Sequence, residues 1–352
     1  EVPATGGQLW FARIDSGEHF RGSATALQER SRTVLDLLGA EPLDEDELTQ
    51  LPGADAFALL RTLYAAHTAG EWDTLVVDLP HTPEALHLLA LPAQLRRYLR
   101  RLLPPERQAA RALRPALAQL AGVPMPTAAL YGTAARWEAE LASVQGVLES
   151  PDTAVRIVAE PGPLAAEALR QARAGLGLYG LSLGAVVANR VLPTGSSDPW
   201  LTSASGRQQK ALAALRAECE AEDVPLRELP HLGRDPGGVD DLDGLASAVG
   251  AQGPAATARR GVPVRSPGSV EDRLAEDGLL VWRMPLPSVR KDELGLVRRG
   301  DELIIGVGPY RRAVPLPSAL RRCRVVGAAL ERGELRVRCA PDPALWPEGT
   351  QS

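Results

Sequence analysis

Cysteine is scarce in this sequence, and its few cysteines are not arranged as metal ligands. The chain of 352 residues has three of them, widely separated and without a Cys-x-x-Cys pair: Cys219, Cys323 and Cys339. A tetrahedral zinc site built from cysteine pairs within one chain is therefore excluded. A sparse, odd set also argues against a disulfide-held secreted domain and suits a reducing compartment, so we expect a cytoplasmic protein.

Lysine is scarcer still. The only two lysines are Lys210 and Lys291, and neither follows a glycine-rich turn. The motif G-x-x-x-x-G-K-[ST], which supplies the backbone amides and the lysine that hold nucleotide phosphates, does not occur. A complete phosphate-binding loop of this kind is therefore excluded from these residues.

Long apolar runs and a basic surplus are also missing. No run approaches the roughly 20 apolar residues of a membrane-spanning helix, so no transmembrane segment is predicted. The net charge is −5, and nucleic-acid binding domains are usually basic, so no nucleic-acid partner is expected. One local cluster of basic residues is interpreted as a solvated face, with an anionic partner as the alternative: Arg96, Arg97, Arg100 and Arg101.

Alternating strand-like and helix-like patterns fill residues 1–250. We predict strands at residues 8–15, 74–78, 155–159, 185–189 and 225–229, with helices between them. The continuous apolar character of residues 74–77 is typical of a parallel strand buried on both faces. The pattern indicates an α/β domain with a doubly wound, mainly parallel sheet. Residues 92–150 read as an inserted helical subdomain, broken into about three helices at Pro104–Pro105 and at residues 124–126.

The composition and the hydrophobic pattern of the sequence change after residue 250. Residues 251–272 are rich in small residues, Pro and Gly without an apolar period, and are predicted to be a linker. Residues 273–345 then show short strand-like runs at 279–284, 302–307, 312–316, 325–329 and 334–339, separated by turn signals. This spacing predicts an antiparallel β-sandwich, which we expect to fold independently on a flexible tether.

The stretch from Asp78 to Pro92 carries the clearest chemical signal. An apolar run delivers Asp78 to the predicted end of a strand, and a Pro/His/Thr turn then leads into a helix-like repeat. Ligands of open α/β sheets bind at strand ends, and nucleotide hydrolases place a magnesium-organising carboxylate there. Asp78 is therefore a candidate metal ligand, although an aspartate at a strand end is more often a helix cap or a turn residue.

This stretch resembles, without a gap, the switch II segment of the ArsA/GET3 family of anion-transporting and tail-anchored-protein-targeting ATPases. The matching positions are Asp78, Thr82, Leu86, Leu88, Leu89, Leu91 and Pro92. Pro83 stands where the family has Gly, and Glu84 where it has His, so a hinge that needs glycine freedom should be stiffer here. The resemblance implies catalytic roles for Asp78 and Thr82, although Thr82 could equally cap the following helix.

Two further segments resemble the part of the family that contacts adenine. Residues 187–193 contain Asn189 and Arg190, and an asparagine amide can read a purine edge. The loop from Pro230 to Gly238 matches a second adenine-side segment, with Asp235 where the family has Glu. The resemblance thus implies nucleotide-binding roles for Asn189, Arg190, Pro230 and Asp235, and ATP and Mg²⁺ as cofactors; for Asn189 the alternative is a turn residue.

Both ends of the chain extend the resemblance. Residues 7–15 look like the family's strand after its first βαβ unit, so we expect the chain to be a fragment without the phosphate-binding unit. Residues 286–317 resemble the Hsp20-like domain appended to bacterial ArsA-type ATPases. Glu167 and Arg170 match a further family pattern, and their spacing of three lets them pair on one helix face.

The resemblance implies a protein that binds and hydrolyses ATP and couples its nucleotide state to a helical region handling a client or an ion. A single ATPase-like repeat would require a homodimer to complete the site. The resemblance also implies a protein client or a membrane partner protein that the ATPase binds. This chain alone is expected to be inactive. The alternatives are a degenerate, non-hydrolysing nucleotide-binding scaffold and a chaperone-like interaction protein that works through the β-sandwich.

Overall fold

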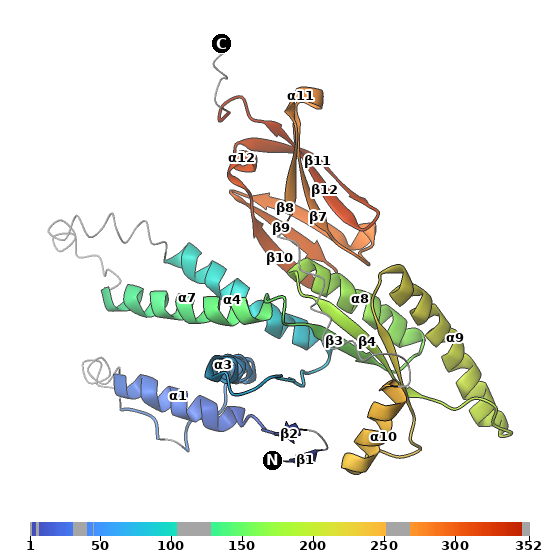
Figure 1. Cartoon of the computed structure of the whole chain (residues 1–352). Coiled ribbons are helices and arrows are strands. Elements are labelled where there is room, and N and C mark those ends of the chain that lie inside the picture. The colour runs from blue at the N-terminus through green and yellow to red at the C-terminus, as the bar shows by residue number, and fades with distance from the viewer. Residues whose placement is uncertain are drawn as a thin grey trace. The chain divides into compact units, whose positions relative to one another are not determined.

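Residues 2–4, 7–30, 41–44, 46–103, 128–250 and 268–346 are described by the computed structural model of the protein (Figure 1). The chain divides into two units, each described by itself. Unit 1 comprises Glu1–Leu79 and Leu91–Val147, and unit 2 comprises Pro80–Ala90 and Leu148–Ser352. The predicted helix breaks at Pro104–Pro105 and residues 124–126, and most of the predicted linker, lie outside the described residues.

Unit 1 is mainly helical. Its elements include α1 (Ser16–Arg30), α3 (Ala54–Ala69), the second half of α4 (Thr82–Leu102) and nearly all of α7 (Ala128–Leu148). Glu138 of α7 accepts hydrogen bonds from Arg96 at 2.9 Å and from Arg100 at 2.6 Å. The bonds from Arg100, and then those from Arg96, hold the pKa of Glu138 below its usual value. Two arginines of the predicted basic cluster therefore join helices.

The predicted strand at residues 8–15 is wrong over most of its length. A small hairpin pairs β1 (Val2–Ala4) with β2 (Gly7–Leu9), and residues 10–15 have no regular structure. The pairing stops at Leu9 because its partner Val2 is the first residue of β1. Phe11, immediately beyond, is 81% exposed.

The predicted strand at residues 74–78 is also wrong. These residues form neither strand nor helix, and Val76 is 91% exposed. An apolar run becomes a buried parallel strand only where neighbouring strands take up its backbone hydrogen bonds and cover both faces. Within the described residues no strand pairs with this run. Asp78 therefore lies in an exposed, extended segment and not at the tip of a strand.

Unit 2 contains the parallel sheet that the sequence predicts. Its strand order is β3 (Val155–Ala159), β4 (Leu183–Val191) and β5 (Leu226–Pro230), with β4 paired in parallel on both sides. The crossovers are α8 (Pro163–Tyr179) and α9 (Pro199–Ala221), which contact each other. These strands and crossover helices confirm the α/β class.

The helix boundaries of unit 2 follow local signals. Asp198 begins α9 by accepting a hydrogen bond from the amide of Leu201 at 2.8 Å, the usual role of an N-cap residue. A further helix, α10 (Val239–Gly250), follows β5 and was not predicted. None of the helices in the described ranges is both long and apolar enough to cross a membrane.

The predicted β-sandwich is confirmed as two antiparallel sheets. One has the order β11-β12-β7-β6 and the other β10-β9-β8. The strands are β6 (Ser269–Arg273), β7 (Leu279–Pro285), β8 (Leu294–Arg299), β9 (Glu302–Val307), β10 (Tyr310–Pro315), β11 (Cys323–Glu331) and β12 (Glu334–Pro341). Three short helical turns complete it: α11 (Leu274–Asp277), η1 (Lys291–Glu293) and α12 (Ser318–Arg321). Because β6 begins at Ser269, the last residues assigned to the linker belong to a strand.

The sandwich does not stand apart on a tether. It packs against α8 within unit 2, and buried residues of both form one hydrophobic core (Figure 1). Two glycines of α8 make the close approach possible. A Cβ atom at Gly177 would lie 2.8 Å from Pro287, and one at Gly175 would lie 2.9 Å from the ring of Tyr310. These contacts are not visible in the local sequence pattern, and independent folding of the sandwich stays a prediction.

Polar contacts surround this interface. Arg170 of α8 donates hydrogen bonds to the carbonyl of Ser288 at 3.0 Å and to both carboxylate oxygens of Glu293 at 2.5 and 2.9 Å. It also binds Glu167 at 2.6 Å, as the spacing of the two residues suggested. Arg312 of β10 donates to the carbonyl of Leu178 at 2.8 Å. The Glu167–Arg170 pair is therefore part of the joint between the α/β part and the sandwich.

We predict that this joint survives a break in the chain. If a specific protease site is inserted within residues 251–267 and cut, the two pieces should co-elute in gel filtration at neutral pH. Replacing Gly177 by Val should separate them, because its side chain would collide with Pro287. Gly206→Val is the matched control, since nothing lies within 4 Å of a Cβ at that helical glycine. Two separate peaks from the cut wild-type protein would contradict the docking.

The joint should also weaken in acid. Hydrogen bonds from Arg170 lower the pKa of Glu167 from 4.5 to about 2, and the pKa of Glu293 is lowered mainly by the same guanidinium. A carboxylate with a lowered pKa stabilises the fold fully above its unfolded-state pKa and loses that contribution as pH falls through its folded-state value. The stability should therefore fall between pH 4.5 and 2.

The measurement is the urea midpoint at pH 5 and pH 3. Arg170→Gln should reduce the difference between the two midpoints, because it removes the cause of both shifts. Arg207→Gln is the control, since Arg207 bonds only the hydroxyl of Ser203. An equal pH dependence in the wild type and in Arg170→Gln would show that this network does not set the acid stability.

Candidate nucleotide site at the carboxyl edge of the sheet

A bulge interrupts β4 at the carboxyl edge of the parallel sheet. Ala188 pairs with Glu228 and Val191 pairs with Pro230, so β4 holds one residue more than β5 over this interval. Arg190 occupies the bulge with φ +55°, in the left-handed region. A non-glycine residue held there costs on the order of 1–3 kcal/mol, and such residues gather at functional sites. Backbone strain thus marks the strand end at which open α/β sheets bind ligands.

The buried side chain of Gln208, on α9, holds this bulge in place. Its Nε2 donates to the carbonyl of Arg190 at 3.0 Å, and its Oε1 accepts from the amide of Leu192 at 2.7 Å. Gln208 is 6% exposed, so these two bonds replace the sheet hydrogen bonds that the bulge removes. The sequence analysis missed this residue, because its contacts span 16 and 18 residues and depend on how α9 packs.

The bulge presents Asn189 and Arg190 beside the loop that follows β5. Asn189 is the only asparagine in the sequence. Its Oδ1 accepts from the amide of Arg190 at 3.0 Å, and its Nδ2 has no partner among the described residues. Arg190 binds Asp235 at 3.0 Å, and both side chains are more than half exposed. An ion pair this exposed contributes only about 0–1 kcal/mol, so it can open for a ligand at little cost.

The loop carrying Asp235 is fixed at both ends. The amide of His231 donates to the carbonyl of Val191 at 2.9 Å, which continues the sheet past Pro230. Arg234 forms a bidentate pair with Asp241 of α10 at 2.6 and 2.7 Å. The pKa of Asp241 is lowered, mainly by the hydrogen bond from the amide of Gly237 and then by Arg234. Four predicted residues therefore meet at one edge: Asn189, Arg190, Pro230 and Asp235.

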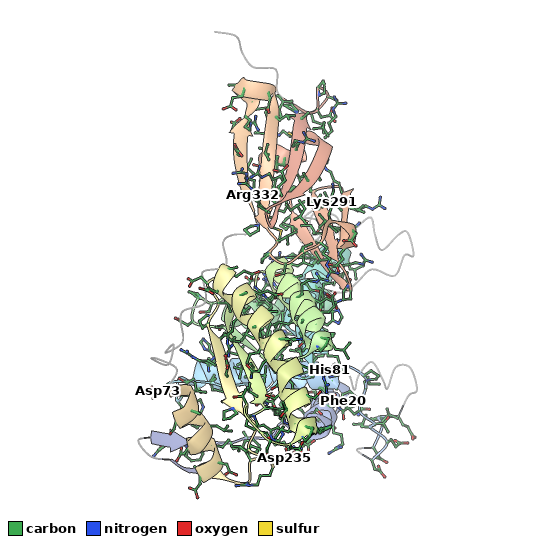
Figure 2. The ribbon with its side chains drawn as sticks, turned by 90° about the vertical axis from the view of Figure 1, so that its right-hand side faces the viewer. Phe20, Asp73, His81, Asp235, Lys291 and Arg332 are labelled. Atoms are coloured by element: carbon green, nitrogen blue, oxygen red, sulfur yellow. The ribbon has the colours of Figure 1, made fainter. Side chains whose placement is uncertain are left out.

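This edge lies at the end of unit 2 away from the sandwich. Figure 2 shows Asp235 at one end of the ribbon, while Lys291 and Arg332 of the sandwich lie toward the other. The sandwich therefore contacts α8 without covering the candidate nucleotide site.

The two residues predicted to act in catalysis lie elsewhere in the fold. Asp78 belongs to unit 1, is exposed and has no partner among the described residues. Thr82 begins α4, is half-buried and belongs to unit 2. The structure thus assembles the predicted adenine-side residues but gives no common geometry with Asp78.

The donor set suits part of a nucleotide. The free Nδ2 of Asn189 and the guanidinium of Arg190 are donors that could read a base edge or stack on it. Magnesium usually takes one or two carboxylates together with phosphates and water, so Asp78 could supply one ligand. Among the described residues no three His, Cys, Asp or Glu side chains cluster to hold a metal by themselves. Asn189 and Arg190 therefore fit a nucleotide base. Asp78 fits a magnesium ion only if nucleotide phosphates supply further ligands.

Comparison with known proteins agrees with both parts of the chain. The family described as anion-transporting ATPase matches residues 4–250, and the HSP20-like domain found in ArsA matches residues 277–338. The second match coincides with the sandwich, from the end of α11 to within β12. Both resemblances seen in the sequence are thereby confirmed.

Three relatives span most of the chain. An uncharacterised protein of Streptomyces coelicolor is 57% identical over 338 residues, which cover 96% of this chain and 83% of that protein. A Mycobacterium tuberculosis protein is 32% identical over 316 residues, covering 86% and 71%. A protein of Aquifex aeolicus, named as a candidate arsenical pump-driving ATPase, is 26% identical over 309 residues, covering 85% and 75%. By these matches the chain belongs to the anion-transporting ATPase family and carries the HSP20-like domain found in ArsA.

Proposed function

We propose that this protein binds ATP with its base at the carboxyl edge of β4 and β5 and hydrolyses it with magnesium held partly by Asp78. The observation that carries the proposal is the strained bulge at Arg190, which is held by Gln208, follows Asn189 directly and pairs with Asp235. Asn189 would donate to the base, and Arg190 would leave Asp235 to contact it. Asp78 would hold the metal, which neutralises phosphate charge during hydrolysis.

The phosphates would have to be held by groups other than a lysine-bearing loop of these residues. Positioning and electrostatics supply nearly all of the catalysis in phosphoryl transfer. Because the chain carries a single ATPase-like repeat, we propose that turnover requires a second subunit and that the working form is a homodimer. Nucleotide state would then be coupled to the helical region around α4 and α7, where a protein client, an ion or a membrane partner protein is handled.

The runner-up function is a nucleotide-binding scaffold that does not hydrolyse ATP. The departures at Pro83 and Glu84 and the scarcity of lysine favour it. Both functions use the same base site, and only hydrolysis separates them. Binding and turnover must therefore be tested apart.

Binding is tested by calorimetry with adenosine and ATP on residues 1–352. We expect adenosine and ATP to bind with similar, weak affinity, because this chain offers donors for the base and no phosphate loop. Asn189→Ala should abolish the binding of both. Arg207→Ala, an exposed change on α9, is the control and should leave it intact. Micromolar ATP binding without adenosine binding would show that groups outside the proposed base site bind the nucleotide. If neither compound binds, the proposed base site is wrong.

Hydrolysis is tested by Asp78→Asn in any assembly of the protein that turns over ATP. The variant should lower kcat by about a hundredfold or more, the usual effect of losing one positioned electrostatic contact at a reacting centre. Its stability should change by less than about 0.5 kcal/mol, because Asp78 is exposed and unpaired in the described structure. Asp73→Asn, five residues earlier in the same exposed segment (Figure 2), is the matched control. Unchanged turnover in Asp78→Asn would remove Asp78 from the site.

A further inference from the structure

Three elements of unit 2 meet at Gly175, on α8. A Cβ atom at this position would lie 2.7 Å from Cδ1 of Leu86, on α4, and 2.9 Å from Cε2 of Tyr310, on β10. Real Cβ atoms do not approach other atoms so closely, so only glycine lets these two side chains share the space. Leu86 is 2% exposed and Tyr310 is 1% exposed. Burying a side chain of the size of Leu86 contributes about 1.5–3 kcal/mol.

The ring of Tyr310 lies between α4 and α8. Its centroid is 5.6 Å from that of His87, on α4, and 6.0 Å from that of Tyr179, on α8. Both distances fall within the range of favourable aromatic contacts. The start of α4 is therefore held by a side chain that belongs to the HSP20-like domain.

The position of Tyr310 is fixed by the sandwich itself. Its backbone pairs with Val307 across the β9–β10 hairpin, and the turn contains Gly308 with φ +53°. A left-handed residue in a two-residue turn keeps the twist of the two strands matched. Any displacement of the sandwich would therefore carry the Tyr310 ring with it.

The part of α4 that Tyr310 contacts follows directly on Asp78. Residues Pro80–Ala90 belong to unit 2 with the sandwich, whereas the residues on either side belong to unit 1. Pro92 lies inside α4 just beyond this boundary and has no N–H to donate to the carbonyl of Leu88. The first turns of α4 are thus anchored to the sandwich, and Pro92 removes one backbone hydrogen bond of the helix beyond them.

We propose that Tyr310 is a positioning residue through which the HSP20-like domain sets the placement of residues 80–90, and with them of Thr82 and the neighbouring Asp78. The inference rests on the proposed function for its effect on turnover. It gives the sandwich a role inside the ATPase: the domain is a rigid support for the segment that follows the metal-binding carboxylate.

The test is hydrogen exchange, read by mass spectrometry on the full chain without nucleotide. Tyr310→Leu keeps apolar bulk but removes the ring, so the amides of residues 85–90 should exchange at least about tenfold faster. The amides of β9 should keep their wild-type rates. Tyr98→Leu, a change of the same kind at an exposed tyrosine of α4, is the matched control and should leave residues 85–90 unchanged.

A second variant reaches the same contact from α8. Gly175→Ala forces Leu86 and Tyr310 apart and should speed exchange in residues 85–90 as Tyr310→Leu does. Gly206→Ala, where nothing lies within 4 Å of the added Cβ, should not. Unchanged protection of residues 85–90 in both Tyr310→Leu and Gly175→Ala would overturn the proposal. Loss of protection that spreads equally to β9 would also overturn it, because it would show a general loss of stability.

Turnover gives the second readout. In an assembly that hydrolyses ATP, Tyr310→Leu should lower kcat by about tenfold or more with KM changed less than about twofold, as expected when a reacting group is misplaced after binding. An unchanged kcat beside faster exchange would overturn the link to catalysis. If no assembly hydrolyses ATP, the proposed hydrolysis fails, while the exchange experiment still decides whether Tyr310 holds residues 80–90.

Discussion

The close contact at Gly175 is the constraint on which the arrangement of unit 2 depends. Without a side chain there, α8 can approach both the start of α4 and the first residue of β10. The same helix also carries Arg170, whose guanidinium binds Glu167, Glu293 and the carbonyl of Ser288. The helix α8 therefore joins the parallel sheet, the segment after Asp78 and the β-sandwich into one core.

At the far edge of the sheet, a different interaction prepares the candidate nucleotide site. The buried amide of Gln208 satisfies the carbonyl of Arg190 and the amide of Leu192, on either side of Val191, and so holds the strained conformation of Arg190. An unsatisfied buried backbone group costs about 1–3 kcal/mol, which is comparable to the strain that the bulge contains. The bulge of the candidate site is therefore held by buried hydrogen bonds, whereas the pair of Arg190 with Asp235 is exposed and opens at little cost.

Local sequence signals predicted elements whose partners lie close in the chain. β9 was predicted with the observed bounds, because its β-branched and aliphatic run lies between two clear turns. β8 was missed, because it contains a glycine, ends in two arginines and has no fully buried residue. α10 was missed although its acidic first turn favours a helix N-terminus and half of its residues are apolar.

Tertiary contacts decided the remaining differences. The apolar run at residues 74–77 has the composition of a central strand, but composition cannot supply a neighbouring strand. The roles of Gln208 and Gly175 were also beyond prediction, because each depends on atoms brought together from separate elements. At the candidate site, the family resemblance identified Asn189, Arg190, Pro230 and Asp235, and the structure showed that they meet.

The exposed run at residues 74–77 has a consequence for solubility. A short β-prone segment with free backbone groups can pair with the same segment of another molecule, and this is how edge-to-edge aggregation begins. Here Asp73 precedes the run and Asp78 follows it. Stacked copies would bring like charges together at both ends, as do the charged residues that guard aggregation-prone segments in other proteins. The charges of Asp73 and Asp78 would therefore oppose self-association through this run.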